Sequence, residues 1–88
     1  MKLLWAADAW EDYVHWQQTD AAVLAMINLL LTEIRPRPYA GLGKPEPLKG
    51  NLSGRWSRRI TGEHRLVYRV AGAADAERVE IVQCRFHY

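Results

Sequence analysis

The sequence predicts an α+β fold in which the elements follow the order β-α-α-β-β-β and a two-helix hairpin packs on one face of a twisted antiparallel sheet. Two observations predict it. Apolar side chains recur at helical spacing between residues 7 and 34, and three β-patterned segments with short turns follow residue 54. A chain of 88 residues supplies one apolar core, so we expect a single domain over residues 1–88.

The N-terminal third is expected to form a strand followed by the helical hairpin. Residues 2–5, KLLW, have the pattern of a short strand, and residues 7–18 place aromatic and apolar side chains at helical spacing. Thr19 or Asp20 provides a good N-cap for a second helix, which must end before Pro36. The few residues between the two helices favour an antiparallel hairpin.

Residues 35–54 form a long connection without periodicity. They contain all four prolines and four of the six glycines of the chain, which is typical of either a functional loop or a disordered segment. Pro45 and Pro47 flank Glu46 and restrict the backbone on both sides of its carboxylate. Glu46 is therefore a candidate functional residue.

Three strands are expected after this connection, in RWSRRIT, HRLVYRVA and ERVEIVQCRFH. Strand alternation turns Leu66 and Tyr68 toward the helices and sends Cys84 and Phe86 inward as well. The opposite face should then be exposed and basic, with Arg65, Arg69, Arg85 and His87.

The register between the first two of these strands has two solutions in the sequence. A two-residue turn at Gly62 and Glu63 places Ile60 beside Arg65, whereas one additional loop or bulge residue brings Arg59 to that face. The number of basic side chains on the exposed face depends on this choice.

Charge is distributed unevenly along a chain whose net charge is only +2. Between Arg35 and Arg69 nine basic residues stand against two acidic ones, whereas residues 1–34 hold one basic and five acidic residues. A concentrated cationic stretch is typical of a surface that binds a polyanion or an acidic segment of a partner. The alternative interpretation is a well-solvated face of the sheet.

The composition excludes several classes of protein. Cys84 is the only cysteine, which excludes an intrachain disulfide and a cysteine-based metal site. No set of His, Asp and Glu has metal-ligand spacing and no Gly-rich phosphate loop is present, so we expect neither a metal nor another cofactor. The apolar run VLAMINLLL is too short to span a bilayer, and we expect no membrane association and a cytoplasmic location.

The basic face and the restrained carboxylate together suit metal-free cleavage of RNA. Such a reaction needs a base for the ribose 2′-OH, a cation for the phosphorane-like transition state, and an acid for the departing 5′ oxygen. Glu46 is the candidate base, Arg65 the candidate phosphate ligand and His87 the candidate acid. Tyr88 offers a further hydroxyl, or a ring that stacks on a base splayed from a single strand.

The motifs that carry these residues resemble one family. GKPEPLKGNLSGRWSRRITGEHRLVYRV at residues 43–70, followed by CRFHY at 84–88, closely resembles the YoeB/Txe toxins of bacterial toxin-antitoxin systems, a branch of the RelE-like family. The opening KLLWAADAWEDYVHWQQTD also fits their first strand and helix. The resemblance covers essentially the whole chain and implies a RelE-like fold.

Such toxins are endoribonucleases that enter the ribosomal A site, cut the mRNA codon there and stop translation. By matching position, the resemblance implies that Glu46 is the general base, Arg65 the phosphate stabiliser and His87 the general acid. It implies that Tyr88 positions substrate or supports proton transfer. It implies that Lys49, Arg59 and Arg58 bind RNA. For Arg58 the alternative is a role in the fold or in contact with the ribosome.

The resemblance also implies partners. These are mRNA in the A site of the ribosome, a cognate antitoxin of the Phd/YefM type whose disordered tail wraps the toxin, and a second copy of the toxin in a homodimer. Two departures from the family pattern are visible. Gly50 stands where many relatives carry a histidine, and VAGAADAERVE lengthens the connection between the last two strands, which we expect to alter an interface rather than the chemistry.

Two alternative functions fit parts of the sequence. One is a module that inhibits translation by occupying the A site without cleaving RNA. The other is a gyrase inhibitor of the related ParE branch. The joint presence of Glu46, Arg65 and His87 argues against both, because neither activity needs a base and an acid on either side of a cation.

Overall fold

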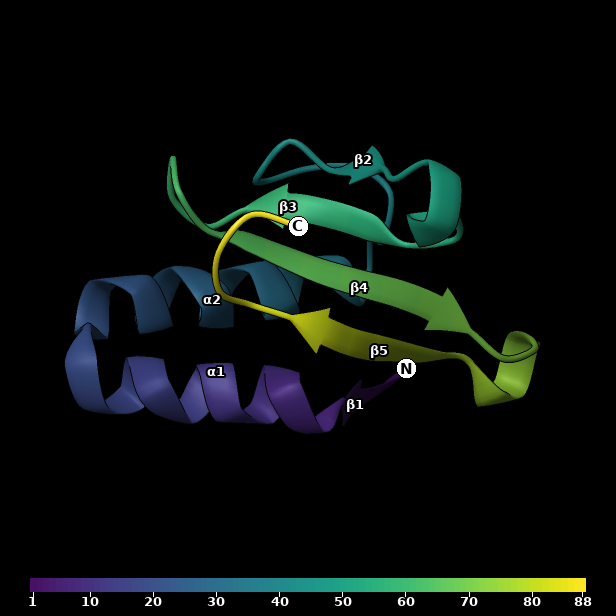
Figure 1. Cartoon of the computed structure of the whole chain (residues 1–88). Coiled ribbons are helices and arrows are strands. Elements are labelled where there is room, and N and C mark those ends of the chain that lie inside the picture. The colour runs from purple at the N-terminus through teal and green to yellow at the C-terminus, as the bar shows by residue number, and fades with distance from the viewer.

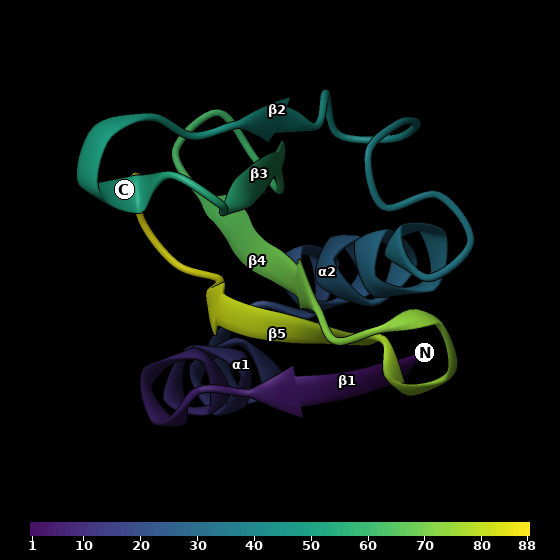
Figure 2. The same cartoon turned by 90° about the vertical axis from the view of Figure 1, so that its right-hand side faces the viewer.

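The computed structural model describes residues 1–88 and contains two helices and a five-stranded sheet (Figures 1 and 2). The helices are α1 (Ala7–Thr19) and α2 (Ala21–Ile34). The strands are β1 (Lys2–Trp5), β2 (Glu46–Pro47), β3 (Trp56–Arg59), β4 (Arg65–Ala71) and β5 (Arg78–Gln83). The expected α+β class and the helical hairpin are confirmed.

The strands lie in the order β1-β5-β4-β3-β2. β3, β4 and β5 form the predicted antiparallel meander. The expectation of a wholly antiparallel sheet is corrected by β1, which runs parallel to β5 and makes the sheet mixed. Residues 46–47 add a short antiparallel edge strand beside β3. A parallel pairing is available to β1 because the whole helical hairpin and three other strands separate it from β5.

Both helices pack on the same face of the sheet. Asp20 begins α2 by accepting hydrogen bonds from the backbone N–H groups of Ala22 at 3.1 Å and Val23 at 3.2 Å, a cap that contributes about 1 kcal/mol. The apolar core is shared by the two helices and the central strands, and its fully buried members include Ala9, Ile27, Leu30, Ile34, Leu66, Tyr68, Val79, Ile81 and Cys84. Neither helix is long and apolar enough to cross a membrane.

The connection after α2 is ordered by the buried side chain of Arg58. Its guanidinium is 0% exposed and donates to the carbonyl oxygens of Arg37, Ala40 and Leu42 and to Tyr68 Oη. Tyr68 Oη in turn donates to the carbonyl of Pro38 at 2.6 Å. Burial raises the pKa of this phenol, so it stays protonated and can donate. The expected loop is therefore held against the sheet by its own carbonyl groups.

Gly43 completes the attachment of this loop. Its backbone has a φ of +86°, and its carbonyl accepts a hydrogen bond of 2.7 Å from the N–H of Arg59. A Cβ atom at this position would lie 2.9 Å from the Leu30 side chain and 3.1 Å from Arg58 Cβ, so both the conformation and the space require glycine. Residues 44–47 are thus delivered to the edge of β3.

The register between β3 and β4 follows the second of the two predicted solutions. Arg59 lies directly opposite Arg65, and Ser57 lies opposite Val67. The turn is longer than two residues because the N–H groups of Ile60 and Thr61 both donate to the carbonyl of His64. Ile60 points into the core and is 6% exposed.

Candidate active site

The candidate site lies on the face of the sheet opposite the helices. Glu46 in β2 pairs with Ser57 in β3, which pairs with Val67 in β4, so these three side chains share one face. The five residues 84–88, hereafter the tail, leave the end of β5 and cross this face until they lie over β3 (Figures 1 and 2). Ser57 and Val67 are 1% and 2% exposed, although no helix covers them. The N–H of Arg65 donates to the carbonyl of Phe86 at 3.0 Å, so the tail is joined to the sheet and is part of the folded domain.

The end of the tail meets the candidate base. Tyr88 Oη donates a hydrogen bond of 3.1 Å to Glu46 Oε1. The rings of His87 and Tyr88 are 5.1 Å apart, and His87 itself is exposed and forms no hydrogen bond within the protein. The structure thus brings the predicted base, the predicted acid and the predicted terminal tyrosine to one place.

The tail does not continue β5, so the expected strand through His87 is wrong. β5 ends at Gln83 because both backbone groups of Cys84 bond to side chains of α1. The N–H of Cys84 donates to Asp12 Oδ2 at 3.1 Å, and the carbonyl accepts from Trp16 Nε1 at 2.9 Å. Cys84 is buried as predicted, and burial raises the pKa of its thiol to about 12.

Two further expectations for the tail are corrected by this path. Phe86 was expected in the core, but it has a φ of +64° and is 54% exposed. Arg85 was expected on the basic face, but its guanidinium lies over the rings of Trp16 and Phe86, at 5.9 and 4.5 Å from their centroids. Strand alternation fails here because the backbone turns after Cys84.

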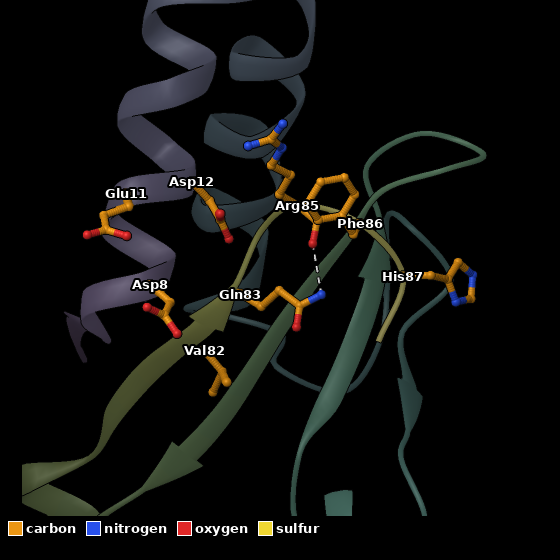
Figure 3. Close-up of a pocket in the computed structure, with 8 residues that line it drawn as sticks. All are labelled: Asp8, Glu11, Asp12, Val82, Gln83, Arg85, Phe86 and His87. Atoms are coloured by element: carbon orange, nitrogen blue, oxygen red, sulfur yellow. Dashed lines mark hydrogen bonds between the residues drawn. The ribbon is translucent and has the colours of Figure 1, made fainter.

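A groove of about 520 Å³ separates the tail from α1. Figure 3 shows Asp8, Glu11 and Asp12 on the helical side, and His87 pointing away from them. The carboxylates therefore lie on the opposite side of the tail from the imidazole. The tail separates the acidic face of α1 from the basic face of the sheet.

Arg65 lies in the site but is buried, which corrects the expectation of an exposed side chain. It is 8% exposed, and its Nη1 donates to the carbonyl oxygens of Thr61 at 2.8 Å, His64 at 3.1 Å and Gly62 at 3.3 Å. These carbonyls fix the guanidinium, while Nε and Nη2 form no hydrogen bond within the protein. A fixed guanidinium with two unused donor positions is suited to a bidentate phosphate contact.

The other predicted basic residues divide into two groups. Lys49 and Arg59 are exposed and form no salt bridge, and Arg59 shares the face of Arg65, its partner in β4. Arg58 lies outside the site, because its buried guanidinium donates to Tyr68 Oη and to the carbonyl oxygens of the loop. Arg69 was expected on the free basic face, but it is paired with Glu80 at 2.8 Å.

Glu80 is shared by two arginines at the far end of this face. Its carboxylate accepts from Arg69 through Oε1 and from Arg78 through Oε2, at 2.8 to 3.1 Å. Hydrogen bonds from Arg69 and then from Arg78 lower the pKa of Glu80. Arg69 is therefore paired with a carboxylate on this face, whereas Arg59 on the same face is not.

His64 is a residue of this site that sequence reasoning missed. Its Nδ1 accepts a hydrogen bond of 2.8 Å from the N–H of Phe86, inside the tail. The only signal in the sequence is its position directly before Arg65, and no spacing connects it to residue 86. The contact joins the start of β4 to the segment that carries His87 and Tyr88.

The chain is similar to bacterial toxins along its whole length. The family model for the YoeB-like toxin of bacterial type II toxin-antitoxin systems matches residues 5–88. Toxin YoeB of Escherichia coli K12 is 52% identical over 88 residues, which is 100% of both chains. The solved structure of a YoeB/ParE toxin from Agrobacterium tumefaciens is 57% identical and has a TM-score of 0.96, covering 100% of both chains.

Solved structures from Staphylococcus aureus extend this comparison to assemblies. A YoeB dimer is 42% identical to this chain with a TM-score of 0.87, and a YoeB-YefM complex is 40% identical with a TM-score of 0.87. Both cover 100% of this chain and 98% of the other. Every candidate site residue falls within the matched region.

Proposed function

This chain belongs to the YoeB-like toxins of bacterial type II toxin-antitoxin systems, and we propose that it is a ribosome-dependent endoribonuclease that cuts the mRNA codon in the A site. The observation that carries the proposal is the contact between Glu46 and Tyr88, which are 42 positions apart in the sequence. It brings the candidate base beside the segment that carries the candidate acid, on a face that also holds Arg65. Translation stops when the codon is cut.

The proposed reaction is an intramolecular transesterification. Glu46 takes the proton of the ribose 2′-OH, and the 2′ oxygen forms a bond to phosphorus as the bond to the 5′ oxygen breaks. His87 gives a proton to that leaving oxygen, so the products are a 2′,3′-cyclic phosphate and a free 5′-hydroxyl. The remaining donors of Arg65 stabilise the charge on the phosphorane-like transition state.

Tyr88 and the free basic residues complete the proposed site. Tyr88 occupies Glu46 Oε1 before RNA binds, and the ribose hydroxyl takes over this acceptor when substrate enters. The phenol ring is then free to stack on a nearby base. Lys49 and Arg59 are exposed and form no salt bridge, and we assign them contacts with phosphates on either side of the cut.

The proposed partners follow from the family and the assemblies of its members. We assign this chain a cognate antitoxin of the Phd/YefM type and a homodimeric state, as in the YoeB-YefM complex and the YoeB dimer of S. aureus. Action on the ribosome corresponds to a cytoplasmic protein.

A cell-free translation reaction tests this function. Purified protein is added to ribosomes translating a defined mRNA, and new mRNA ends are mapped by primer extension. Cleavage at the A-site codon is expected with the unmodified chain and is expected to fall at least a hundredfold with Glu46→Gln or His87→Ala. Glu77→Gln is the matched control, because Glu77 is exposed and forms no salt bridge.

Two results would contradict the proposal. Translation arrest with intact mRNA, unchanged in both variants, would identify a protein that only occupies the A site. Unimpaired translation together with inhibition of gyrase supercoiling would identify a toxin of the ParE type.

A further inference from the structure

We propose that His64 is a positioning residue that holds the tail so that His87 and Tyr88 face Glu46 and Arg65. This inference rests on the proposed endoribonuclease function. It assigns no contact with RNA to His64. Its role is to fix the backbone of the residue that precedes the proposed acid.

Both backbone polar groups of Phe86 are held by the start of β4. The N–H of Phe86 donates to His64 Nδ1 at 2.8 Å, and its carbonyl accepts from the N–H of Arg65 at 3.0 Å. No other side chain bonds the backbone of residues 86–88. Phe86 is therefore the last point at which the backbone of the tail is fixed.

The backbone conformation at Phe86 explains why it needs to be held. Its φ of +64° lies in the left-handed region, which costs a bulky residue about 1 kcal/mol or more. The kink lies in the tail, which leaves the line of β5 and crosses the sheet (Figure 2). Without a bond at Phe86 the segment is expected to relax toward an extended backbone, which displaces His87 and Tyr88.

The His64 ring is itself held in place by its neighbours. It packs in a T-shaped arrangement with the Trp16 ring, with centroids 4.7 Å apart, and its centroid lies 5.9 Å from that of the Phe86 ring. Its Nε2 lies 3.3 Å from Glu63 Oε1. A proton on Nε2, directed at this carboxylate, leaves Nδ1 as the acceptor that Phe86 requires.

Two substitutions separate the acceptor from the ring. His64→Phe keeps an aromatic ring against Trp16 but removes the acceptor, whereas His64→Asn removes the ring but can place a carbonyl oxygen near the position of Nδ1. We expect kcat for mRNA cleavage to fall about tenfold to a hundredfold in the first variant with little change in KM. The second variant should recover most of the lost rate.

A second approach removes the donor instead of the acceptor. Cys84 permits ligation of a synthetic peptide of residues 84–88 to a thioester of residues 1–83, so Phe86 can be replaced by phenyllactic acid, which has an ester oxygen in place of the N–H. The loss of kcat should match that of His64→Phe. Combining the two changes should cause no further loss, since both remove the same bond.

Amide hydrogen exchange at Phe86 gives a readout that is independent of activity. Faster exchange in His64→Phe and protection in His64→Asn are expected. If the Phe variant cleaves mRNA at the original rate, or if its Phe86 amide stays protected, the assignment of His64 is overturned. If the unmodified chain does not cleave mRNA, the proposed function fails, and the exchange rates alone decide whether His64 holds the tail.

Discussion

The hydroxyl of Tyr88 donates a hydrogen bond to Oε1 of Glu46, so the end of the tail lies on the carboxylate that stands between two prolines. Pro45 and Pro47 limit the backbone conformation around Glu46, and the Glu46 carboxylate in turn holds the Tyr88 hydroxyl. In the proposed reaction, RNA replaces the Tyr88 hydroxyl before Glu46 accepts a proton from the ribose.

Tyr88→Phe should slow cleavage without preventing RNA binding. The ring remains available for stacking, whereas the hydroxyl, once released from Glu46, can no longer bond to the substrate, a loss worth about 1 kcal/mol or about fivefold in rate. Single-turnover cleavage on programmed ribosomes measures this effect. Tyr39→Phe is the control, because Tyr39 is exposed and its hydroxyl forms no hydrogen bond. An equal loss of rate in both variants would contradict the role given to Tyr88.

Arg58 and Arg59 are adjacent in the sequence and should respond oppositely to substitution. Arg58→Met leaves several buried acceptors unpaired and should lower the free energy of unfolding by about 3 kcal/mol or more, measured in urea. Arg59→Met should change stability by less than about 0.5 kcal/mol. It should weaken RNA binding and reduce the salt dependence of affinity by about one counterion. The reverse pattern would mean that the two roles have been exchanged.

The carboxylate of Glu80 predicts a pH-dependent contribution to stability. Its folded pKa lies below the ordinary value of 4.5, so the ionised form stabilises the fold above that pH, and this stabilisation is lost as pH falls through the folded pKa. Glu80→Gln should therefore be less stable than the unmodified chain at pH 7, and the two free energies of unfolding should converge as the pH falls below 4.5. Urea unfolding across this range checks the prediction, with Glu77→Gln as an exposed carboxylate that should show no such convergence.

Burial of Cys84 predicts a thiol that reacts only when the protein opens. With a pKa of about 12 in the folded state, almost no thiolate is present at pH 8. Iodoacetamide should modify the folded chain slowly and at a rate that rises with urea. Because the folded pKa lies above the unfolded value near 9, Cys84 should also reduce stability as pH rises from 9 toward 12. Rapid alkylation in the absence of denaturant would contradict this description.

The elements of this fold are predictable because neighbouring residues specify them. Asp20 caps α2 through residues two and three positions away, and Pro36 stops the same helix. Alternation in β4 assigns Leu66 and Tyr68 to the core correctly. The candidate base Glu46 could also be predicted from the sequence, because the two prolines that restrain it are its immediate neighbours.

The path of the tail could not be predicted from neighbouring residues. Cys84 bonds to Asp12 and Trp16, which precede it by 72 and 68 positions, and no local pattern shows these contacts. Alternation therefore extended the strand to His87 and placed Phe86 in the core. Alternation assigned Arg65 to the correct face of the sheet but did not predict its burial. The burial arises from the carbonyl groups of the turn, which surround the guanidinium.

The pairing of β1 with β5 joins the two ends of the chain, with Leu3 beside Val79. Contacts between residues so distant in sequence form late in folding, whereas α1 and α2 can associate as soon as both exist. At a synthesis rate of about 5–20 residues per second, a growing chain holds its helices for seconds before β5 and the tail are made. During that time the residues of the tail have not been synthesised, so Glu46 and Arg65 lack their contacts with Tyr88 and Phe86. Under the proposed function, a ribosome therefore finishes this chain before the site that acts on ribosomes is assembled.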